Sequence, residues 1–133
     1  MRIACLVALV ARQILVVDDE EAIRVIVQAS LEFTAGWTVL VAASAVDGLQ
    51  MARAERPDAV LIDVMMPGTG GVELLKLLRS HPLTADIPAI FLTAQIDLAE
   101  QETLKSLGDG VILKPFEPVA IAQKIRSILG WPD

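Results

Sequence analysis

Five short apolar runs set the strongest limit on the fold of this chain. Each is three or four residues long, rich in β-forming residues and continuous instead of alternating: ILVV (14–17), TVLV (38–41), AVLI (59–62), AIFL (89–92) and VIL (111–113). A strand with one buried face alternates apolar with polar residues, whereas a strand covered on both faces is apolar throughout. The runs therefore predict five central strands, each buried between two layers.

Helical patterns fill the segments between the runs. Three stretches have apolar residues at helical spacing: Ile23, Ile26, Val27 and Leu31; Val72, Leu75 and Leu78; and Ile121, Ile125, Ile128 and Leu129. A fourth stretch, around 97–107, has a thinner apolar stripe. This alternation predicts an α/β fold of the flavodoxin-like, doubly wound (βα)5 type. We expect a five-stranded parallel sheet in the order 2-1-3-4-5 with helices on both faces.

Capping residues mark the expected helix boundaries. Ser44 and Asp97 each precede a helical stretch and are followed three residues later by an acidic residue, which is the pattern of a capping box. Pro118 suits the first turn of the last helix, and Gly130 suits its end.

Length and composition exclude several classes of protein. A chain of 133 residues makes one domain with a real core, and 54% hydrophobic against 21% charged residues excludes a disordered chain. The net charge of −6, without any Lys/Arg run, argues against nucleic-acid binding. The single cysteine, Cys5, excludes an internal disulfide and fits a reducing, cytoplasmic setting. With only one histidine, a His/Cys zinc site is not expected either.

The first twelve residues, MRIACLVALVAR, differ from the rest of the chain. Their apolar run, Ile3–Ala11, is shorter than the about 20 residues that cross a bilayer, so we expect no membrane anchor. Its length suits the core of a signal peptide, but no good cleavage site follows. We expect an apolar N-terminal extension over residues 1–12, and an upstream start site or a foreign tail stays open as an alternative. The domain then covers residues 13–130, and residues 131–133 are a tail.

Polar residues follow the apolar runs at one end. Asp18 and Asp19 come after the first run, Asp63 after the third, Thr93 after the fourth and Lys114 after the fifth. The carboxyl ends of parallel strands share one edge of the sheet, and a crevice opens there between strands one and three. Taken singly, each residue has an ordinary explanation, such as a helix N-cap or a solvated turn lysine. Their joint position on one rim predicts a functional site.

Three carboxylates in one crevice predict a hard divalent cation. Two negative charges about 5 Å apart repel by roughly 3 kcal/mol at an effective dielectric constant of about 20. Mg²⁺ prefers oxygen ligands and often binds through one or two carboxylates plus phosphate oxygens. The lysine and the threonine hydroxyl suit a phosphoryl group that arrives beside the metal. A carboxylate at such a site can be the nucleophile that forms an acyl phosphate.

Four stretches carry a family pattern, in the family's order and at sensible intervals: ILVVDDEE (14–21), AVLIDVMMPGTGG (59–71), IPAIFLTA (87–94) and VILKPFEP (111–118). An aspartate followed by Val-Met-Met-Pro, combined with Lys-Pro-Phe before the last helix, is a specific signature. Together the stretches resemble the receiver domain of bacterial two-component response regulators, of the chemotaxis type. The resemblance covers residues 13–130.

The resemblance implies a role for each acid of the crevice. Asp63 looks like the phosphoacceptor, Asp19 like the acid that binds Mg²⁺ directly, and Asp18 like the acid that acts through water. The backbone carbonyl of Met65 would complete the protein's share of the metal site. The phosphoryl group would come from a phosphohistidine on a sensor histidine kinase or a phosphotransfer protein.

The resemblance also implies a switch. Thr93 looks like the hydroxyl that moves onto a phosphoryl oxygen, and Lys114 like the cation that pairs with it. The bond between Lys114 and Pro115 is cis in many relatives. Where relatives carry a Tyr or Phe that follows the movement of the threonine, this chain has Val111. We therefore expect the signal to leave through the loop after Thr93 and the fourth helix.

The implied function is a phosphorylation-dependent switch that signals by docking to a downstream target protein. We expect no contact with nucleic acid or membrane, and a homodimer is left open. The chain stops just after the last helix, so we expect a stand-alone receiver that catalyses only its own phosphorylation and dephosphorylation. Two alternatives remain: a pseudo-receiver that is never phosphorylated, and a Mg²⁺-dependent aspartyl-phosphate phosphatase for small molecules. The phosphatase is disfavoured because such enzymes carry a second acid two residues after the nucleophile, where this chain has Met65.

Overall fold

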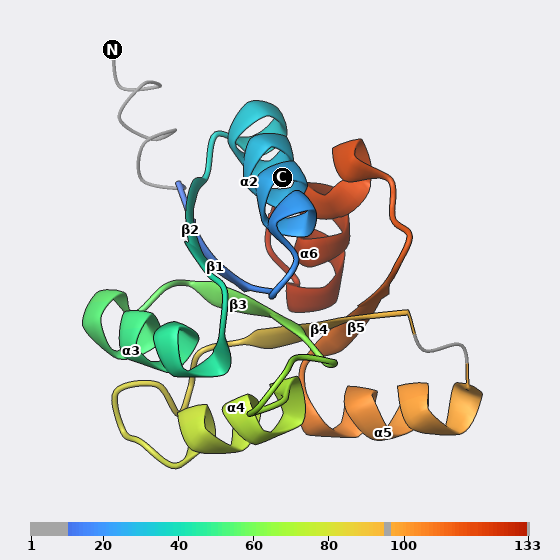
Figure 1. The fold of residues 1–133 in the computed structure, drawn as a ribbon. Helices are drawn as coiled ribbons and strands as arrows, with labels where there is room; N and C mark the ends of the chain where they lie inside the picture. Colours follow the sequence, from blue (N-terminus) through green and yellow to red (C-terminus); the bar gives the residue numbers. More distant parts are fainter. Residues whose placement is uncertain (1–10, 95–96, 133) are drawn as a thin grey trace.

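All five apolar runs are strands of one parallel sheet (Figure 1). The computed structural model describes residues 11–94 and 97–132. The strands are β1 (Gln13–Val17), β2 (Thr38–Ala42), β3 (Ala59–Asp63), β4 (Ala89–Thr93) and β5 (Gly110–Leu113). Their order in the sheet is β2-β1-β3-β4-β5, which confirms the predicted order. Each strand exceeds its apolar run by one residue, because one residue before the run (β1 and β5) or after it (β2, β3 and β4) also pairs with the neighbouring strand.

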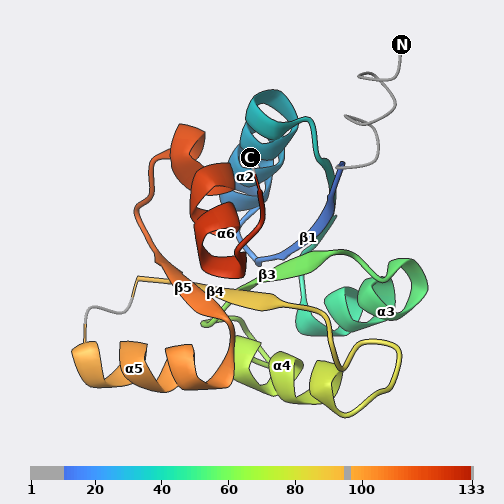
Figure 2. The same cartoon turned by 180° about the vertical axis from the view of Figure 1, so that it is seen from behind.

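The helices cover both faces of the sheet (Figures 1 and 2). One face carries α2 (Glu21–Ala35) and α6 (Ile121–Leu129), and the other carries α3 (Ala45–Glu55), α4 (Gly71–Arg79) and α5 (Leu98–Leu107). β2 lies on one side of β1, and β3 lies on its other side, so the connection from β1 to β2 runs across the sheet in the opposite direction to the later connections. Connections between parallel strands share one handedness, so this change of direction places their helices on opposite faces of the sheet. The flavodoxin-like α/β fold predicted from the sequence is therefore confirmed.

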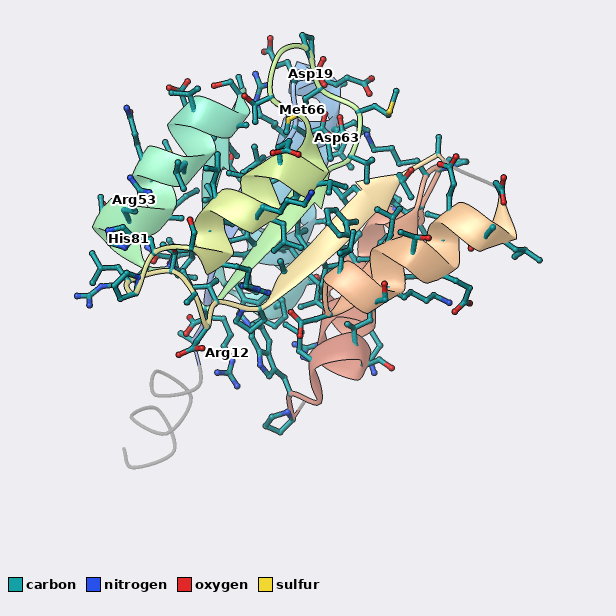
Figure 3. The ribbon with its side chains drawn as sticks, turned by 90° about the horizontal axis from the view of Figure 1, so that it is seen from below. Arg12, Asp19, Arg53, Asp63, Met66 and His81 are labelled. Carbon is teal, nitrogen blue, oxygen red and sulfur yellow. The ribbon has the colours of Figure 1, made fainter. Side chains whose placement is uncertain are left out.

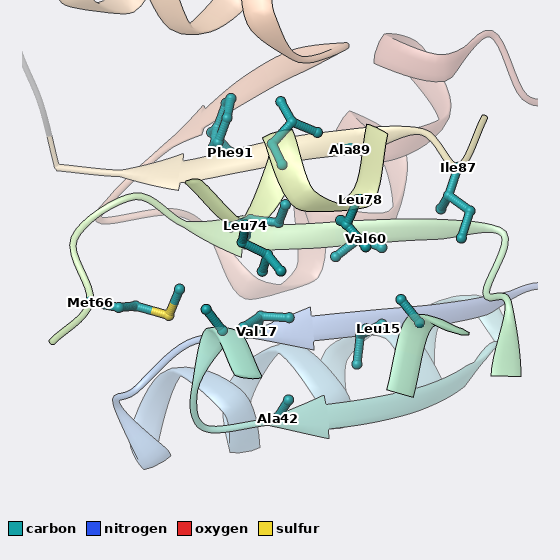
Figure 4. Packing of buried hydrophobic residues seen from close by; sticks show 14 of the residues in the cluster. Leu15, Val17, Ala42, Val60, Met66, Leu74, Leu78, Ile87, Ala89 and Phe91 are labelled. Atoms are coloured by element: carbon teal, nitrogen blue, oxygen red, sulfur yellow. The ribbon is translucent and has the colours of Figure 1, made fainter. Parts of the chain in front are cut away.

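Alternate residues of the strands fill two separate apolar layers. On β1, Ile14 and Val16 belong to the layer beneath α2 and α6, whereas Leu15 and Val17 belong to the layer beneath α3, α4 and α5. Figure 4 shows the second layer, where Leu74 of α4 packs over the sheet. Full burial of a Val, Leu or Ile side chain stabilises the fold by about 1.5–3 kcal/mol. Because both faces of β1 are covered in this way, its sequence is continuously apolar.

The helix ends mostly follow the predicted caps. The Ser44 hydroxyl accepts a hydrogen bond from the Asp47 amide at 3.2 Å, and the Asp97 carboxylate accepts one from the Ala99 amide at 2.8 Å. Asp97 is therefore the N-cap of α5, and this bond comes from the second helical residue. Gly130 ends α6 with a positive φ of 70°, where glycine has no steric cost.

Pro118 corrects one expectation from the sequence. It does not begin α6 but a 3₁₀ turn, η1 (Pro118–Ala120), which the Ala120 amide closes on the Glu117 carbonyl at 3.0 Å. The Ser30 hydroxyl of α2 donates to the Pro118 carbonyl. That contact links α2 to the 3₁₀ turn, and α6 itself starts at Ile121.

Two tryptophans and two arginines pack together at the amino end of the sheet. The rings of Trp37 and Trp131 meet edge-on with centroids 5.6 Å apart. The Arg12 guanidinium lies 4.3 Å from the centroid of Trp131, and that of Arg126 lies 5.1 Å from the centroid of Trp37. Each cation–π contact contributes on the order of 0.5–2 kcal/mol. Trp131, which the sequence assigned to a tail, is thus half-buried against the layer beneath α6.

The N-terminal extension expected from the sequence lies mostly outside the described residues, which include only Ala11 and Arg12 of it. The Arg12 carbonyl accepts a hydrogen bond from the Thr38 amide at 2.9 Å, so the residue before β1 already pairs with β2. Within the ranges that the structure describes, we find no helix with the length and apolar character needed to cross a membrane.

Candidate functional site

The predicted crevice residues meet at the carboxyl end of the sheet. Asp18 follows β1 directly, Asp63 and Thr93 are the last residues of β3 and β4, and Lys114 follows β5. Since β1 and β3 are neighbours, their ends bring Asp18 and Asp63 together. Figure 3 shows Asp19 beside Asp63 at this end of the sheet. The juxtaposition expected from the strand order is therefore present.

Three carboxylates form a cluster that could hold a metal ion. One ligand oxygen from each of Asp18, Asp19 and Asp63 lies within 4.8 Å of the others. Asp18 is completely buried and Asp63 is 4% exposed, whereas Asp19 faces solvent. The exposed acid leaves the cluster open on one side, so a hydrated cation can reach it. An all-oxygen donor set suits a hard divalent ion.

Lys114 supplies positive charge to this cluster. Its Nζ atom lies 3.0 Å from Oδ2 of Asp18, 3.3 Å from Oδ1 of Asp63 and 3.6 Å from Oε1 of Glu20. The lysine side chain is only 14% exposed, so its two pairs with buried acids are less screened than surface pairs. The sequence predicted Lys114 as a partner for a phosphoryl group; it did not predict that the same ammonium bridges the acids of β1 and β3.

Burial and neighbouring charges change the proton affinity of Asp63. Burial, and then the negative charge of Asp18, raise the pKa of Asp63 from 3.8 to about 6, against the lowering effect of Lys114. For Lys114, burial acts to lower the pKa, but the hydrogen bonds and charges of Asp18 and Asp63 outweigh it and the pKa is raised. At neutral pH, Asp63 is therefore mostly a carboxylate and Lys114 is a cation.

Backbone contacts fix the position of Asp18. Its Oδ1 accepts a hydrogen bond from the Glu20 amide at 2.9 Å, its own amide donates to the Ala42 carbonyl at 3.1 Å, and its carbonyl accepts from Nη1 of Arg24 at 2.8 Å. Sequence reasoning missed the roles of Glu20 and Arg24. The position of Glu20 within a run of four acids was a usable signal, whereas nothing marked Arg24.

The sequence also predicts roles at this site for Thr93, Met65 and Pro115. Thr93 is 3% exposed, and its carbonyl accepts from the Lys114 amide at 2.8 Å, which ties the end of β4 to the end of β5. Met65, two residues after Asp63, is 80% exposed, and the role of its backbone carbonyl as a metal ligand stays a prediction. The peptide bond between Lys114 and Pro115 is cis, the isomer that the resemblance implied.

Val111 lies next to β4 and beneath α5. It is half-buried in β5, faces Phe91 in the strand register, and packs against the apolar layer that includes Leu104 of α5. A valine has a stiff χ1 and no ring that could exchange between a buried and an exposed position. The consequence for signalling stays a prediction.

A close contact joins the start of α4 to the strand that ends in Asp63. A Cβ atom on Gly71 would lie 2.4 Å from the Asp63 carbonyl oxygen, whereas a Cβ on Gly70 would meet only the Val64 carbonyl oxygen, at 3.4 Å. The Gly71 amide donates to the Val64 carbonyl at 3.0 Å. Glycine at position 71 therefore allows α4 to begin directly against the end of β3 and fixes the intervening loop.

Known proteins share this arrangement. A family model described as "Response regulator receiver domain" matches residues 14–126. The chain belongs to this family. Receiver domains are the phosphorylation-dependent signalling modules of two-component systems, and their proteins interact with histidine kinases and with downstream targets.

Curated relatives of this receiver domain are about twice as long. The phosphate regulon transcriptional regulatory protein PhoB of Pseudomonas aeruginosa is 36% identical over 124 residues, which cover 91% of this chain and 53% of that protein. The probable transcriptional regulator ycf27 of Cyanophora paradoxa is 40% identical over 119 residues, which cover 89% and 48%. The chain thus spans about half the length of these relatives.

Solved receiver structures match it over nearly their whole length. A putative response regulator from Chloroflexus aurantiacus has a TM-score of 0.82 at 34% identity, covering 90% of this chain and 98% of that one. The chemotaxis protein CheY4 of Vibrio cholerae has a TM-score of 0.81 at 28% identity, covering 89% and 98%.

Proposed function

We propose that this receiver domain accepts a phosphoryl group on Asp63 and signals through the change that the new group imposes on the crevice. One observation carries the proposal. Asp63 is almost fully buried, yet it lies 3.3 Å from the Lys114 ammonium and beside two further acids, one of which opens to solvent. A structural carboxylate would not need an open, acidic neighbourhood of this kind.

The chemistry assigned to Asp63 is a phosphoryl transfer. An oxygen of its carboxylate attacks the phosphorus of a phosphohistidine, the bond between phosphorus and ring nitrogen breaks, and the imidazole takes the electron pair and a proton. Lys114 then pairs with a phosphoryl oxygen, and the Thr93 hydroxyl donates to another. Water later hydrolyses the acyl phosphate, which releases inorganic phosphate and restores the carboxylate.

We assign a Mg²⁺ site to Asp18, Asp19 and Asp63, with the backbone carbonyl of Met65 as a further ligand. All four groups offer oxygen, and the exposure of Asp19 leaves room for water on the ion. Mg²⁺ bound there would neutralise charge that develops on the phosphoryl oxygens. Lys114 offsets only one of the charges of Asp18 and Asp63, so with the exposed Asp19 the three carboxylates keep an excess of negative charge for a cation to neutralise.

The proposed phosphodonor is a sensor histidine kinase or a phosphotransfer protein, and the proposed output is docking to a downstream target protein. The five residues Asp18, Asp19, Asp63, Thr93 and Lys114 are all in place at the strand ends, which favours an active receiver over a pseudo-receiver. Against the small-molecule phosphatase, position 65 is a methionine with no proton to give to a leaving group.

Phosphate incorporation from acetyl phosphate, with and without Mg²⁺, tests the proposal. We expect one phosphoryl group per chain in the presence of Mg²⁺, none on Asp63→Asn, and a wild-type level on the control Asp86→Asn, which alters an exposed aspartate. Incorporation into Asp63→Asn at the wild-type level would identify another acceptor. A wild type that takes up no phosphate would be a pseudo-receiver, and sustained turnover of small phosphate esters would indicate a phosphatase.

A further inference from the structure

A hollow of about 560 Å³ lies between α4 and α5, next to the crevice; we call it the α4–α5 hollow. Val64 and Thr93 line it at the ends of β3 and β4, Val72 lines it from α4, and Leu104 and Leu107 line it from α5. Figure 3 looks onto this face of the sheet, where α4 and α5 lie on either side of β4. The hollow thus reaches from the helix surface down to the strand ends that carry the site.

The volume of the α4–α5 hollow indicates which kind of ligand it can hold. Small-molecule pockets usually enclose about 300–1,000 Å³. Two turns of an α-helix with its side chains, about 10–12 Å across and 11 Å long, occupy on the order of 1,000 Å³. A partner helix could therefore place only single side chains in the α4–α5 hollow, whereas a small molecule fits whole.

The residues that line the α4–α5 hollow indicate the polarity and charge of the ligand. Most of the described lining residues are apolar, so burial of an aromatic or aliphatic body is favoured. Glu100 and Thr103 of α5 add polar oxygen atoms, and none of the described lining residues is basic. With a net charge of −6 on the whole chain, an anionic ligand is disfavoured and a cationic one is attracted.

We propose that the α4–α5 hollow is a binding site for a small amine with an apolar body, and that its occupancy is coupled to phosphorylation. Thr93 lines the hollow and also belongs to the crevice, and Val64 directly follows Asp63. A ligand that favours one position of Thr93 changes the affinity of the crevice for a phosphoryl group, and the reverse follows from linkage. The coupling rests on the proposed function; the binding itself does not.

Binding is tested with 2-naphthylmethylamine as the probe and the unphosphorylated full chain as the target. We expect saturable 1:1 binding, with amide chemical-shift changes centred on residues 64–72 and 97–107. Thr103→Trp, which fills the hollow from an exposed helical position, should weaken binding at least tenfold, and so should Val72→Phe from the opposite wall. The matched control Ser106→Trp alters an exposed residue of α5 outside the lining and should bind like the wild type.

Two further variants test whether the α4–α5 hollow prefers a positively charged ligand. Glu100→Gln should weaken binding of the amine several-fold but leave binding of the neutral 2-naphthalenemethanol unchanged, whereas Glu102→Gln, on the exposed face of the same helix, should alter neither. Absence of saturable binding, equal binding by Thr103→Trp and Ser106→Trp, or shift changes confined to other elements would overturn the site. Preference for a helical peptide over the amine would overturn the small-molecule assignment.

Coupling is tested by the rate of acetyl phosphate incorporation with and without saturating probe. We expect a change of at least fivefold in the wild type and none in Thr103→Trp. An unchanged rate in the wild type would overturn the coupling. If the protein takes up no phosphate but binds the probe, the proposed function fails and the site stands; if it takes up phosphate but does not bind the probe, the site fails and the proposed function stands.

Discussion

Asp63 must be a carboxylate to act as a nucleophile, yet burial and the charge of Asp18 favour its protonated form. The folded-state pKa of about 6 lies above the ordinary value of 3.8. The folded protein therefore holds this proton more tightly than the unfolded chain does. The resulting stabilisation is fully present below pH 3.8 and is lost as the pH rises through about 6.

This proton linkage predicts a pH-dependent difference between the wild type and Asp63→Asn. A shift of about two pKa units corresponds to roughly 3 kcal/mol. Without divalent cations, we expect the free energy of unfolding of Asp63→Asn to rise relative to that of the wild type by roughly 2–3 kcal/mol between pH 4 and pH 7. Urea unfolding at several pH values measures this; parallel curves for the two proteins would contradict it.

Lys114 is predicted to be a structural residue as well as a functional one. In Lys114→Ala, the completely buried Asp18 loses its cation, and removing one partner of a buried pair costs about 3–5 kcal/mol. The control Lys76→Ala breaks a pair with Glu73 in which both side chains are more than 60% exposed, and should cost less than about 1 kcal/mol. Urea unfolding at pH 7 without divalent cations compares them. Equal costs would show that Lys114 is not needed for stability.

At the scale of elements, the junction between β3 and α4 is the tightest point near the site. We predict that Gly71→Ala lowers the free energy of unfolding by about 1–3 kcal/mol, because its Cβ must displace the Asp63 carbonyl. It should also slow phosphate incorporation, since the end of β3 shifts. Gly70→Ala, which meets its nearest neighbour at an ordinary distance, is the matched control and should change stability by about 0.5 kcal/mol. Similar losses in both variants would remove the close contact as the explanation.

The helix α5 is predicted to carry the switch. Leu104 is its one buried residue among those described, whereas α4 buries four residues in nine. Elements with few buried apolar side chains shift most easily. With a phosphoryl group or its mimic on Asp63, we expect altered hydrogen exchange over residues 97–104. Changes centred on residues 111–116, with α5 unaffected, would show that the signal passes through β5 despite Val111.

At the scale of the molecule, the sequence predicts the features that follow from the strand order, and it does not predict which side chains pair with one another. Strand order places Asp18, Asp63 and Lys114 on one edge, because that edge collects the ends of all parallel strands. The pairing of Lys114 with Asp18 joins residues 96 positions apart, and no local pattern shows which acid a given lysine meets. The α4–α5 hollow was likewise unpredictable, since it depends on how two helices pack against the same face.

Metal binding is predicted to stabilise the whole domain. A ligand at 100 times its Kd, bound only by the folded state, adds about 2.7 kcal/mol, and each kcal/mol raises Tm by roughly 2–8 °C. We expect Mg²⁺ to raise the Tm of the wild type and much less that of Asp19→Asn. Without metal, Asp19→Asn should be more stable than the wild type by about 1 kcal/mol, because one repelling charge is gone. NaCl at equal ionic strength is the control, and an equal rise in both proteins would contradict the site.

The cluster of Trp37 and Trp131 with its two arginines has a spectroscopic consequence. The chain contains no tyrosine and only these two tryptophans, so its emission on excitation of tryptophan originates at the amino end of the sheet. The five residues of β1, about 16 Å of extended chain, separate that end from the crevice. Intrinsic fluorescence therefore records global unfolding and is insensitive to events confined to Asp63. Any change in emission on phosphorylation would measure a rearrangement that crosses the full length of the sheet.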